Sequence, residues 1–270
     1  MKSENVNIQA YDNVEQLKNF DDIKSIELYR NERLTMYKDH VSYVQSTSRD
    51  KKLNIIEIGS GSSAFLFQLN NQKLLERGVG IEISNSRYQF AEKWKSDLNN
   101  QSIENINANF NEVILEENYY DIIFCIDNTL SYLQPENKQY PNLFIEKSRK
   151  WLKRGGLLIL EMHNYNPIIE KMNDNILYFL KRNKASNPFD YSLYYYEYDE
   201  NENQITTHSK YLSKTHDNKE KKEISFVYNI QSLTDLIDDK FKIDDIYSNF
   251  KKNQFFNDSE EMVLVCQKTS

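Results

Sequence analysis

The sequence predicts an α/β fold: a mostly parallel sheet flanked by helices, with an antiparallel insertion. Two observations lead to this prediction. Between residues 53 and 162, short apolar runs alternate with segments of helical spacing, which is typical of a parallel sheet with right-handed crossovers. After Asn187, three strand-like segments follow one another with only polar turns between them, which is typical of an antiparallel meander.

Composition limits the class of protein. The 270 residues are 39% hydrophobic and include 14 Phe and 19 Tyr, enough for a packed core. Only 6 Gly and 4 Pro occur, which excludes fibrous and disordered classes. The net charge is -7, and acidic residues interrupt the lysine clusters. Binding to phosphates requires a basic surface, so we expect no nucleic-acid partner.

The chain carries no sign of export or membrane insertion. Residues 1–20 are polar and lack the apolar core of a signal peptide. No run approaches the roughly 20 apolar residues that span a bilayer. Cys125 and Cys266 lie within apolar runs, which favours reduced core thiols over a disulfide or a metal site. We expect a cytoplasmic protein with no membrane partner and no bound metal.

The first half of the chain supplies most of the predicted sheet. Apolar residues at helical spacing predict a helix over 21–45. The first strand, Leu53–Ile58, is followed by a glycine-containing turn and a helical stretch through Leu75. Gly155 and Gly156 form the turn into the fifth strand. The remaining strands are expected at 79–83, 106–108, 120–126 and 157–162, with helices at 86–98 and 144–152.

The second half contains the insertion and completes the sheet. The meander strands are expected at Tyr191–Tyr198, Ile205–Leu212 and Glu223–Ile230. Helical spacing returns at Leu233–Ile237, and strands at Phe241–Tyr247 and Met262–Gln267 bring the main sheet to seven. We therefore predict a single domain over 1–270, with a core over 53–186 and 231–270 and an insertion over 187–230.

The sharpest local signal is the glycine turn after the first strand, Glu57-Ile-Gly59-Ser60-Gly61. Glycines permit a tight turn and let a ligand approach bare backbone amides, and the N-terminus of the following helix favours an anionic group. Glu82 ends the second strand, where a carboxylate can accept both hydroxyls of a ribose. A nicotinamide-dependent oxidoreductase is an alternative, because the turn nearly fits the dinucleotide fingerprint. Glu57, which precedes the glycines, counts against it.

This turn together with Glu82 resembles the cofactor loop of class I S-adenosylmethionine-dependent methyltransferases, which have a Rossmann-like sheet. The chain is further similar to glycine N-methyltransferase and its small-molecule relatives in three segments. These are Asp121–Leu133 around the fourth strand, Gly155–Asn166 around the fifth, and Arg33 followed by Tyr37-Lys38 in the first helix. The resemblance covers most of residues 26–166.

The resemblance implies S-adenosylmethionine as cofactor, with Glu57 near its methionine end, Glu82 on its ribose and Arg33 on its carboxylate. The helix over 21–45 would cover it. Asn109 stands where the family often has an Asp that accepts from the adenine amino group, and its amide oxygen can still accept that bond. The full set of implied cofactor residues is Arg33, Glu57, Gly59, Ser60, Gly61, Glu82, Ile83, Asn109, Phe110, Ile126, Asp127 and Asn128.

The implied substrate side departs from glycine methylation. His163 stands where an Arg would hold the amino-acid carboxylate, and neutral imidazole cannot replace that bidentate charge. His163 is the candidate catalytic group, as a base or hydrogen-bonding partner; the alternative is a polar strand-end residue without chemistry. The insertion would cover the substrate. The alternative is that one face of its tyrosine-rich strand simply belongs to the core. The implied substrate residues are Tyr132, His163, Asn164, Tyr165, Tyr194 and Tyr196.

The predicted function is S-adenosylmethionine-dependent methyl transfer to an amine or hydroxyl of a small polar molecule. The donor carbon is already activated by the sulfonium, so the protein mainly aligns the reactants; a hydroxyl acceptor would also need a general base. A methyltransferase acting on a macromolecule, and a methyltransferase-like binding or regulatory protein, are further alternatives. A homodimer is compatible with these observations.

Overall fold

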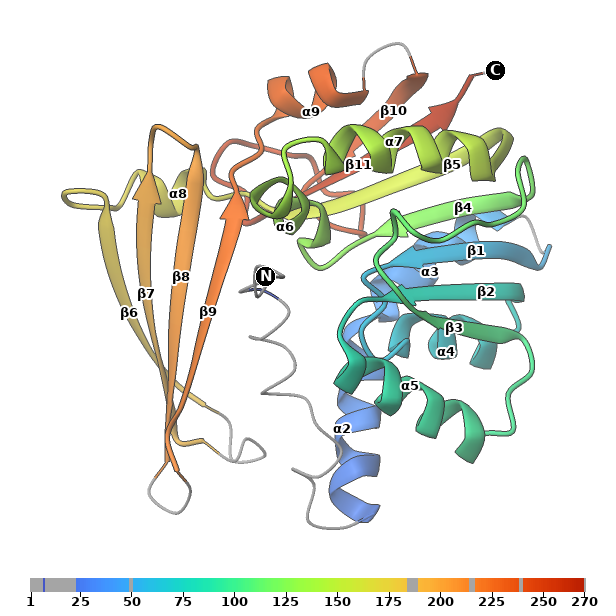
Figure 1. Cartoon of the computed structure of the whole chain (residues 1–270), viewed down its shortest axis with the longest axis horizontal. Helices are drawn as coiled ribbons and strands as arrows, with labels where there is room; N and C mark the ends of the chain where they lie inside the picture. Colours follow the sequence, from blue (N-terminus) through green and yellow to red (C-terminus); the bar gives the residue numbers. More distant parts are fainter. Residues whose placement is uncertain are drawn as a thin grey trace.

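The computed structural model describes residues 7, 23–48, 51–183, 189–213, 217–237 and 240–269. These form a seven-stranded sheet in the order β10-β11-β5-β4-β1-β2-β3, called sheet A, and a four-stranded sheet in the order β6-β7-β8-β9, called sheet B (Figure 1). The strands of sheet A are β1 (Leu53–Ile58), β2 (Leu75–Glu82), β3 (Ile103–Asn107), β4 (Tyr120–Cys125), β5 (Leu152–His163), β10 (Phe241–Tyr247) and β11 (Glu261–Lys268). The predicted α/β fold with an antiparallel insertion is confirmed.

Helices cover both faces of sheet A. One face packs against α2 (Ile23–Met36), α3 (Lys38–Ser48), α4 (Ala64–Asn71) and α5 (Asn85–Asp97). The other packs against α6 (Thr129–Glu136), α7 (Tyr140–Trp151) and α9 (Ile230–Ile237) (Figure 1). Central strands are therefore buried on both sides, which explains why Ile55 and Ile56 are both fully buried although they belong to different core clusters.

Parallel pairing aligns the carboxyl ends of the central strands. β1 pairs in parallel with β2 and β4, and β4 pairs in parallel with β5. β11 runs antiparallel to both β5 and β10. The residues that follow β1, β2, β4 and β5 therefore meet at one edge of sheet A, where ligands of open α/β sheets bind.

Several boundaries differ from the prediction. The helix expected over 21–45 is two helices, α2 and α3, which break at Tyr37. β2 begins at Leu75 rather than Val79, because Lys73 takes a left-handed φ of 59° that ends the preceding helix. Gly155 and Gly156 lie within β5 instead of before it. Apolar spacing alone does not reveal such local breaks.

Sheet B is larger than expected and contains four strands: β6 (Ile176–Arg182), β7 (Tyr191–Asp199), β8 (Gln204–Leu212) and β9 (Lys219–Phe226). β6 lies within the range assigned to the core, so the antiparallel unit begins before residue 187. The short helix α8 (Asn166–Ile169) leads into it. Sheet B stands beside one end of sheet A, with β9 nearest to α6 (Figure 1).

Among the helices of the described residues, none has the length and apolar character needed to cross a membrane. Cys125 and Cys266 are free and buried, on β4 and β11. Burial raises the pKa of the Cys266 thiol to about 12 and that of Cys125 further. Neither thiol forms appreciable thiolate at neutral pH while the chain is folded.

We therefore predict that both thiols resist modification in the native protein, because thiolate is the reactive form. Ellman's reagent at about pH 8, below both raised pKa values, is expected to titrate no thiol in buffer. In denaturant, where both pKa values return to the ordinary range, it should titrate both. Rapid labelling without denaturant would contradict the burial of these strands.

Candidate active site

The glycine turn is shaped by internal hydrogen bonds. The amides of Gly59 and Ser60 both donate to the carbonyl of Ile81, at 2.9 and 3.1 Å. The Gly61 amide donates to Glu82 Oε2 at 2.7 Å. These three amides are therefore already engaged within the protein, and their bonds fold the turn against β2.

Position 59 requires a glycine, because its backbone is left-handed and because another side chain lies too close for a Cβ atom. Its φ is +70°, and a Cβ at this position would lie 2.5 Å from Thr129 Oγ1. Thr129 follows the residues Asp127 and Asn128, which we call the β4 turn. Glycine thus lets the loop after β1 and the turn after β4 come into contact.

Glu82 lies buried at the end of β2 and is held in place by two amides. Oε2 accepts from Gly61 and Oε1 accepts from the amide of Ser84 at 2.7 Å. Each carboxylate oxygen has two lone pairs, so hydroxyl groups can donate to Glu82 while these bonds persist. Ile83 follows it with 36% of its side chain exposed.

Glu57 is a buried acid of the site whose pKa is raised. It is 1% exposed, and its Oε2 has no hydrogen-bond partner among the described residues. Burial raises the pKa of Glu57 well above its usual range, the charges of Asp127 and Glu82 raise it further, and the charge of Arg33 lowers it. Arg33 on α2 therefore lies near Glu57. An acid in this position favours a ligand that brings positive charge.

The backbone of the β4 turn is strained, and hydrogen bonds to neighbouring residues keep it in this conformation. Asp127 and Asn128 both take left-handed φ values, 52° and 64°. The Asp127 amide donates to Glu161 Oε2, and the Asn128 amide donates to the Glu161 carbonyl, both at 3.2 Å. The Tyr37 hydroxyl donates to Asp127 Oδ2 at 2.6 Å. The break between α2 and α3 thus places Tyr37 directly on the turn.

Glu161 also connects the turn to the amino-terminal helices. His40 Nε2 lies 3.3 Å from Glu161 Oε2, and the His40 ring stacks on Phe250 with centroids 3.9 Å apart. Glu261 lies in the same group: burial, and next the charge of Glu161, raise its pKa to about 7. None of these residues was predicted for the site, because the sequence pattern does not show that a strand interior, a helix and the loop before β11 meet at this turn.

A triangle of hydrogen bonds joins the β4 turn to sheet B. Asn128 Nδ2 donates to the Tyr165 hydroxyl at 3.0 Å and to Ser225 Oγ at 3.3 Å. The Tyr165 hydroxyl donates to Ser225 Oγ at 3.2 Å. Asn128 Oδ1 accepts from the His163 amide at 3.2 Å. All three side chains of the triangle are buried. Asn128, predicted on the cofactor side, contacts Tyr165, predicted on the substrate side, and Ser225 was not among the predicted residues.

Further polar groups lie beside this triangle on the face of sheet B that meets it, which we call the inner face. The Tyr132 hydroxyl donates to Glu223 Oε1 at 3.0 Å, and Lys221 pairs with the same oxygen at 2.9 Å. Tyr194 and Tyr196 stack on β7 with rings 6.4 Å apart. Lys221 and Glu223 were missed because their alternating charges are equally typical of a solvated strand.

Four predicted residues have other contacts. Asn164 donates both amide hydrogens, to the carbonyls of Asn257 and Ser259, and so holds the loop before β11. The side chains of Phe110 and Ile126 pack into the two core clusters. Asn109 Nδ2 donates to Glu136 Oε1 at 3.3 Å.

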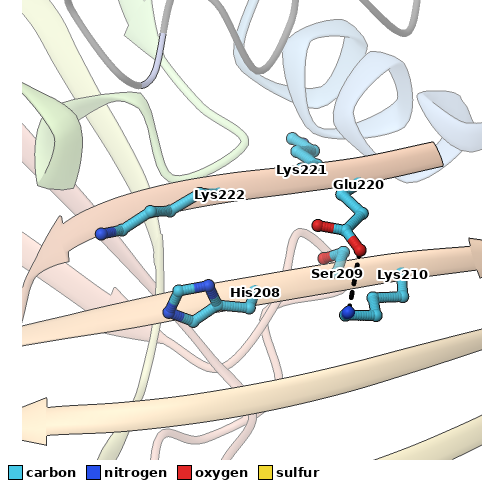
Figure 2. Close-up of a pocket in the computed structure, with 6 residues that line it drawn as sticks. All are labelled: His208, Ser209, Lys210, Glu220, Lys221 and Lys222. Carbon is cyan, nitrogen blue, oxygen red and sulfur yellow. Dashed lines mark ion pairs between the residues drawn. The ribbon is translucent and has the colours of Figure 1, made fainter.

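The His163 side chain is exposed and meets Tyr165 edge-on at 5.9 Å. In the part of the chain that the structure describes, no group of three or more His, Cys, Asp or Glu side chains could hold a metal ion. A shallow hollow lies on β8 and β9 of sheet B (Figure 2). Of its lining residues, Lys210 pairs with Glu220, His208 contacts Glu197 and Lys221 pairs with Glu223, and none of the predicted site residues lines it.

Known proteins resemble the chain in sequence and in fold. A family model described as a methyltransferase domain matches residues 49–226. The sequence matches no curated protein.

The fold is similar to that of three solved structures. The CcbJ methyltransferase from Streptomyces caelestis is 16% identical, with 86% of this chain and 89% of that chain covered and a TM-score of 0.75. An S-adenosylmethionine-dependent methyltransferase from Clostridium acetobutylicum is 12% identical, with 87% of this chain and 92% of that chain covered and a TM-score of 0.68. DesVI from Streptomyces venezuelae is 10% identical (88% and 92% covered, TM-score 0.59).

The match to the family model spans both the glycine turn and the β4 turn, and sheet A has the strand order in which these turns meet. The chain therefore belongs to the methyltransferase-domain family, as a class I methyltransferase whose cofactor is S-adenosylmethionine.

Proposed function

We propose that this protein transfers the methyl group of S-adenosylmethionine to an amine or hydroxyl of a small polar molecule. The observation that supports this best is the polar inner face of sheet B beside the β4 turn. Lys221 and Glu223 lie there with side chains only 13% and 12% exposed. Polar groups this enclosed suit a small acceptor that enters between the sheets, whereas a macromolecule needs an open surface.

The charges of the site suit this cofactor. S-adenosylmethionine carries an ammonium and a sulfonium, and Glu57, Glu82 and Asp127 surround the proposed site with carboxylates whose charges act on one another. We assign the ribose to Glu82, the methionine ammonium to Glu57 and the methionine carboxylate to Arg33. The cofactor's cations would offset the cost of burying Glu57.

A nicotinamide dinucleotide fits the same site poorly. Its pyrophosphate is anionic and requires backbone donors in the glycine turn. The amides of Gly59, Ser60 and Gly61 already donate within the protein, and the nearby carboxylates would repel the phosphates. These two features favour the methyl donor over the oxidoreductase alternative.

In the proposed reaction the protein mainly orients its reactants. The bound cofactor supplies an electrophilic methyl carbon, and a neutral amine can attack it without a base. A hydroxyl acceptor would need a base, for which His163 is the candidate. Asn128 and Tyr165 would position the acceptor indirectly, because their bonds to each other and to Ser225 hold the β4 turn against sheet B. Burial raises the pKa of Tyr165 far above its usual range, so its hydroxyl stays neutral and keeps its bond to Ser225. A cytoplasmic location and a homodimer stay predictions.

The first test concerns Glu82. Replacing Glu82 with Ala removes the ribose acceptor and releases Gly61, so we expect S-adenosylmethionine affinity to fall about 100-fold, since bonds to charged groups contribute ~1.5–3 kcal/mol each. Calorimetry measures it. Glu104→Ala, which removes an exposed carboxylate paired with Arg77 on the same sheet, should bind normally. Equal affinity of the Glu82 variant and wild type would remove Glu82 from the ribose role.

The second test concerns the proton on Glu57. The raised pKa means that Glu57 is protonated over a range of pH in which an ordinary carboxyl is ionised, and binding of a cation favours the ionised form. Cofactor binding should therefore release a proton, and affinity should rise with pH until it passes the raised pKa and then level off.

Calorimetry in two buffers of different ionisation enthalpy measures this proton release. It is best done at about pH 6, where an α-amino group is fully protonated. Glu57→Gln should abolish the release and flatten the pH dependence. Proton release that persists in the variant would show that another group carries it.

The proposed reaction is tested with methyl-labelled S-adenosylmethionine. The wild-type protein is offered small amines, small alcohols, bulk RNA and an unfractionated protein extract, and the label is followed by mass spectrometry. We expect label in a small molecule, and about a 100-fold slower transfer by Asn128→Ala, because positioning contributes up to roughly 7–11 kcal/mol to such reactions. Label confined to RNA or protein would overturn the small-molecule proposal and leave the cofactor assignment intact.

A further inference from the structure

The inner face of β9 presents a charged pair to the β4 turn. Alternation along a strand places Lys221, Glu223 and Ser225 on one face. Ser225 contacts Asn128 and Tyr165, so this face is directed toward the proposed reaction site. Lys222 and His208 belong to the opposite face, and Figure 2 shows Lys221 projecting away from them.

Three tyrosines lie near the Glu223 carboxylate. Tyr132 on α6 donates to it directly. Tyr165 contacts Ser225, two positions along β9. Tyr196 on β7 lies in the same row of sheet B as Glu223, with Thr207 of β8 between them, and after burial the charge of Glu223 is one of the causes that raise the pKa of the Tyr165 and Tyr196 hydroxyls. Glu223 stands two positions from Ser225 along β9, and hence close to Asn128.

A carboxylate among aromatic rings is a binding site for an organic cation. The carboxylate pairs with an ammonium, and the ring faces attract it by about 0.5–2 kcal/mol each. A hydroxyl acceptor has no charge, so it gains neither the ion pair with the carboxylate nor the attraction of the ring faces. Resting on the proposed function, we propose that Glu223 selects the methyl acceptor as an amine, by binding its ammonium group among Tyr132, Tyr165 and Tyr196.

Lys221 is compatible with this role. It pairs with the oxygen of Glu223 that Tyr132 also contacts, and a carboxylate has about four acceptor positions. The ammonium of the acceptor joins the lysine at this carboxylate or exchanges with it. A purely structural pair would make no distinction between amines and alcohols.

The transfer step balances for an amine. The acceptor first loses one proton to water, and the nitrogen lone pair then forms a bond to the methyl carbon. The carbon–sulfur bond breaks with its electron pair on sulfur, which gives S-adenosylhomocysteine. The nitrogen carries the positive charge after transfer, as a methylammonium, and Glu223 stabilises this charge.

The test uses matched pairs of ligands that differ in one group: benzylamine and benzyl alcohol, phenethylamine and phenethyl alcohol, cyclohexylamine and cyclohexanol. Their binding to the full chain loaded with S-adenosylhomocysteine is measured by ligand-observed NMR at neutral pH. The variants are Glu223→Gln and, as matched control, Glu220→Gln, which removes an exposed carboxylate on the opposite face of the same strand. Thermal unfolding and S-adenosylhomocysteine affinity are recorded for each.

We expect wild type and Glu220→Gln to bind at least one amine about 10-fold more tightly than its alcohol, and Glu223→Gln to lose that preference with S-adenosylhomocysteine affinity unchanged. Alcohols that bind as tightly as amines, or a preference that survives in Glu223→Gln, would overturn the inference. Failure of the proposed function is distinguishable, because the wild-type protein would then not bind S-adenosylhomocysteine, or would transfer label only to RNA or protein.

Discussion

The hydrogen bonds around Asp127 and Asn128 hold the site together. Two consecutive left-handed residues without glycine cost roughly 1–2 kcal/mol each, and they persist because surrounding groups fix them. Glu161 on β5 accepts both amides, Tyr37 holds the Asp127 carboxylate, and Ser225 on sheet B contacts Asn128. Each of these bonds contributes about 1 kcal/mol net. The turn thereby fixes the amino-terminal helices, sheet A and sheet B relative to one another.

Electrostatics at the strand ends follows from the parallel topology. The ends of β1, β2 and β4 bring Glu57, Glu82 and the β4 turn to one edge, so their negative charges accumulate and raise the pKa of the most buried acid. Such a site is costly without a cation, because neither burial nor like charges favour ionisation. The same features that would destabilise an empty site give it affinity for a sulfonium nucleoside and work against a dinucleotide.

The sequence predicted the main sheet well, because buried parallel strands read as continuous apolar runs. The resemblance to known methyltransferases gave site roles to Glu57, Glu82, Asn128 and Tyr165, which the structure places at or just after the carboxyl ends of neighbouring strands of sheet A. The sequence did not predict β6, whose Ile-Leu-Tyr-Phe-Leu-Lys-Arg run does not alternate. Tyr37 and Glu161 were noted only within resembling segments and without a role, and Ser225 was missed; the three reach the site from a helix break, a strand interior and a distant strand. Only three-dimensional packing brings such residues together.

The two sheets divide the chemistry between them. In the proposed assignment sheet A supplies the turns that hold the cofactor, and the fold of this sheet is shared with solved structures only 10–16% identical to this chain. The acceptor side depends on side chains of β7 and β9, which project from a strand framework made by main-chain pairing. Such side chains can change without altering the framework. On the proposed function, acceptor choice is encoded in a few inner-face positions, and the contact of Ser225 with Asn128 connects those positions to the β4 turn.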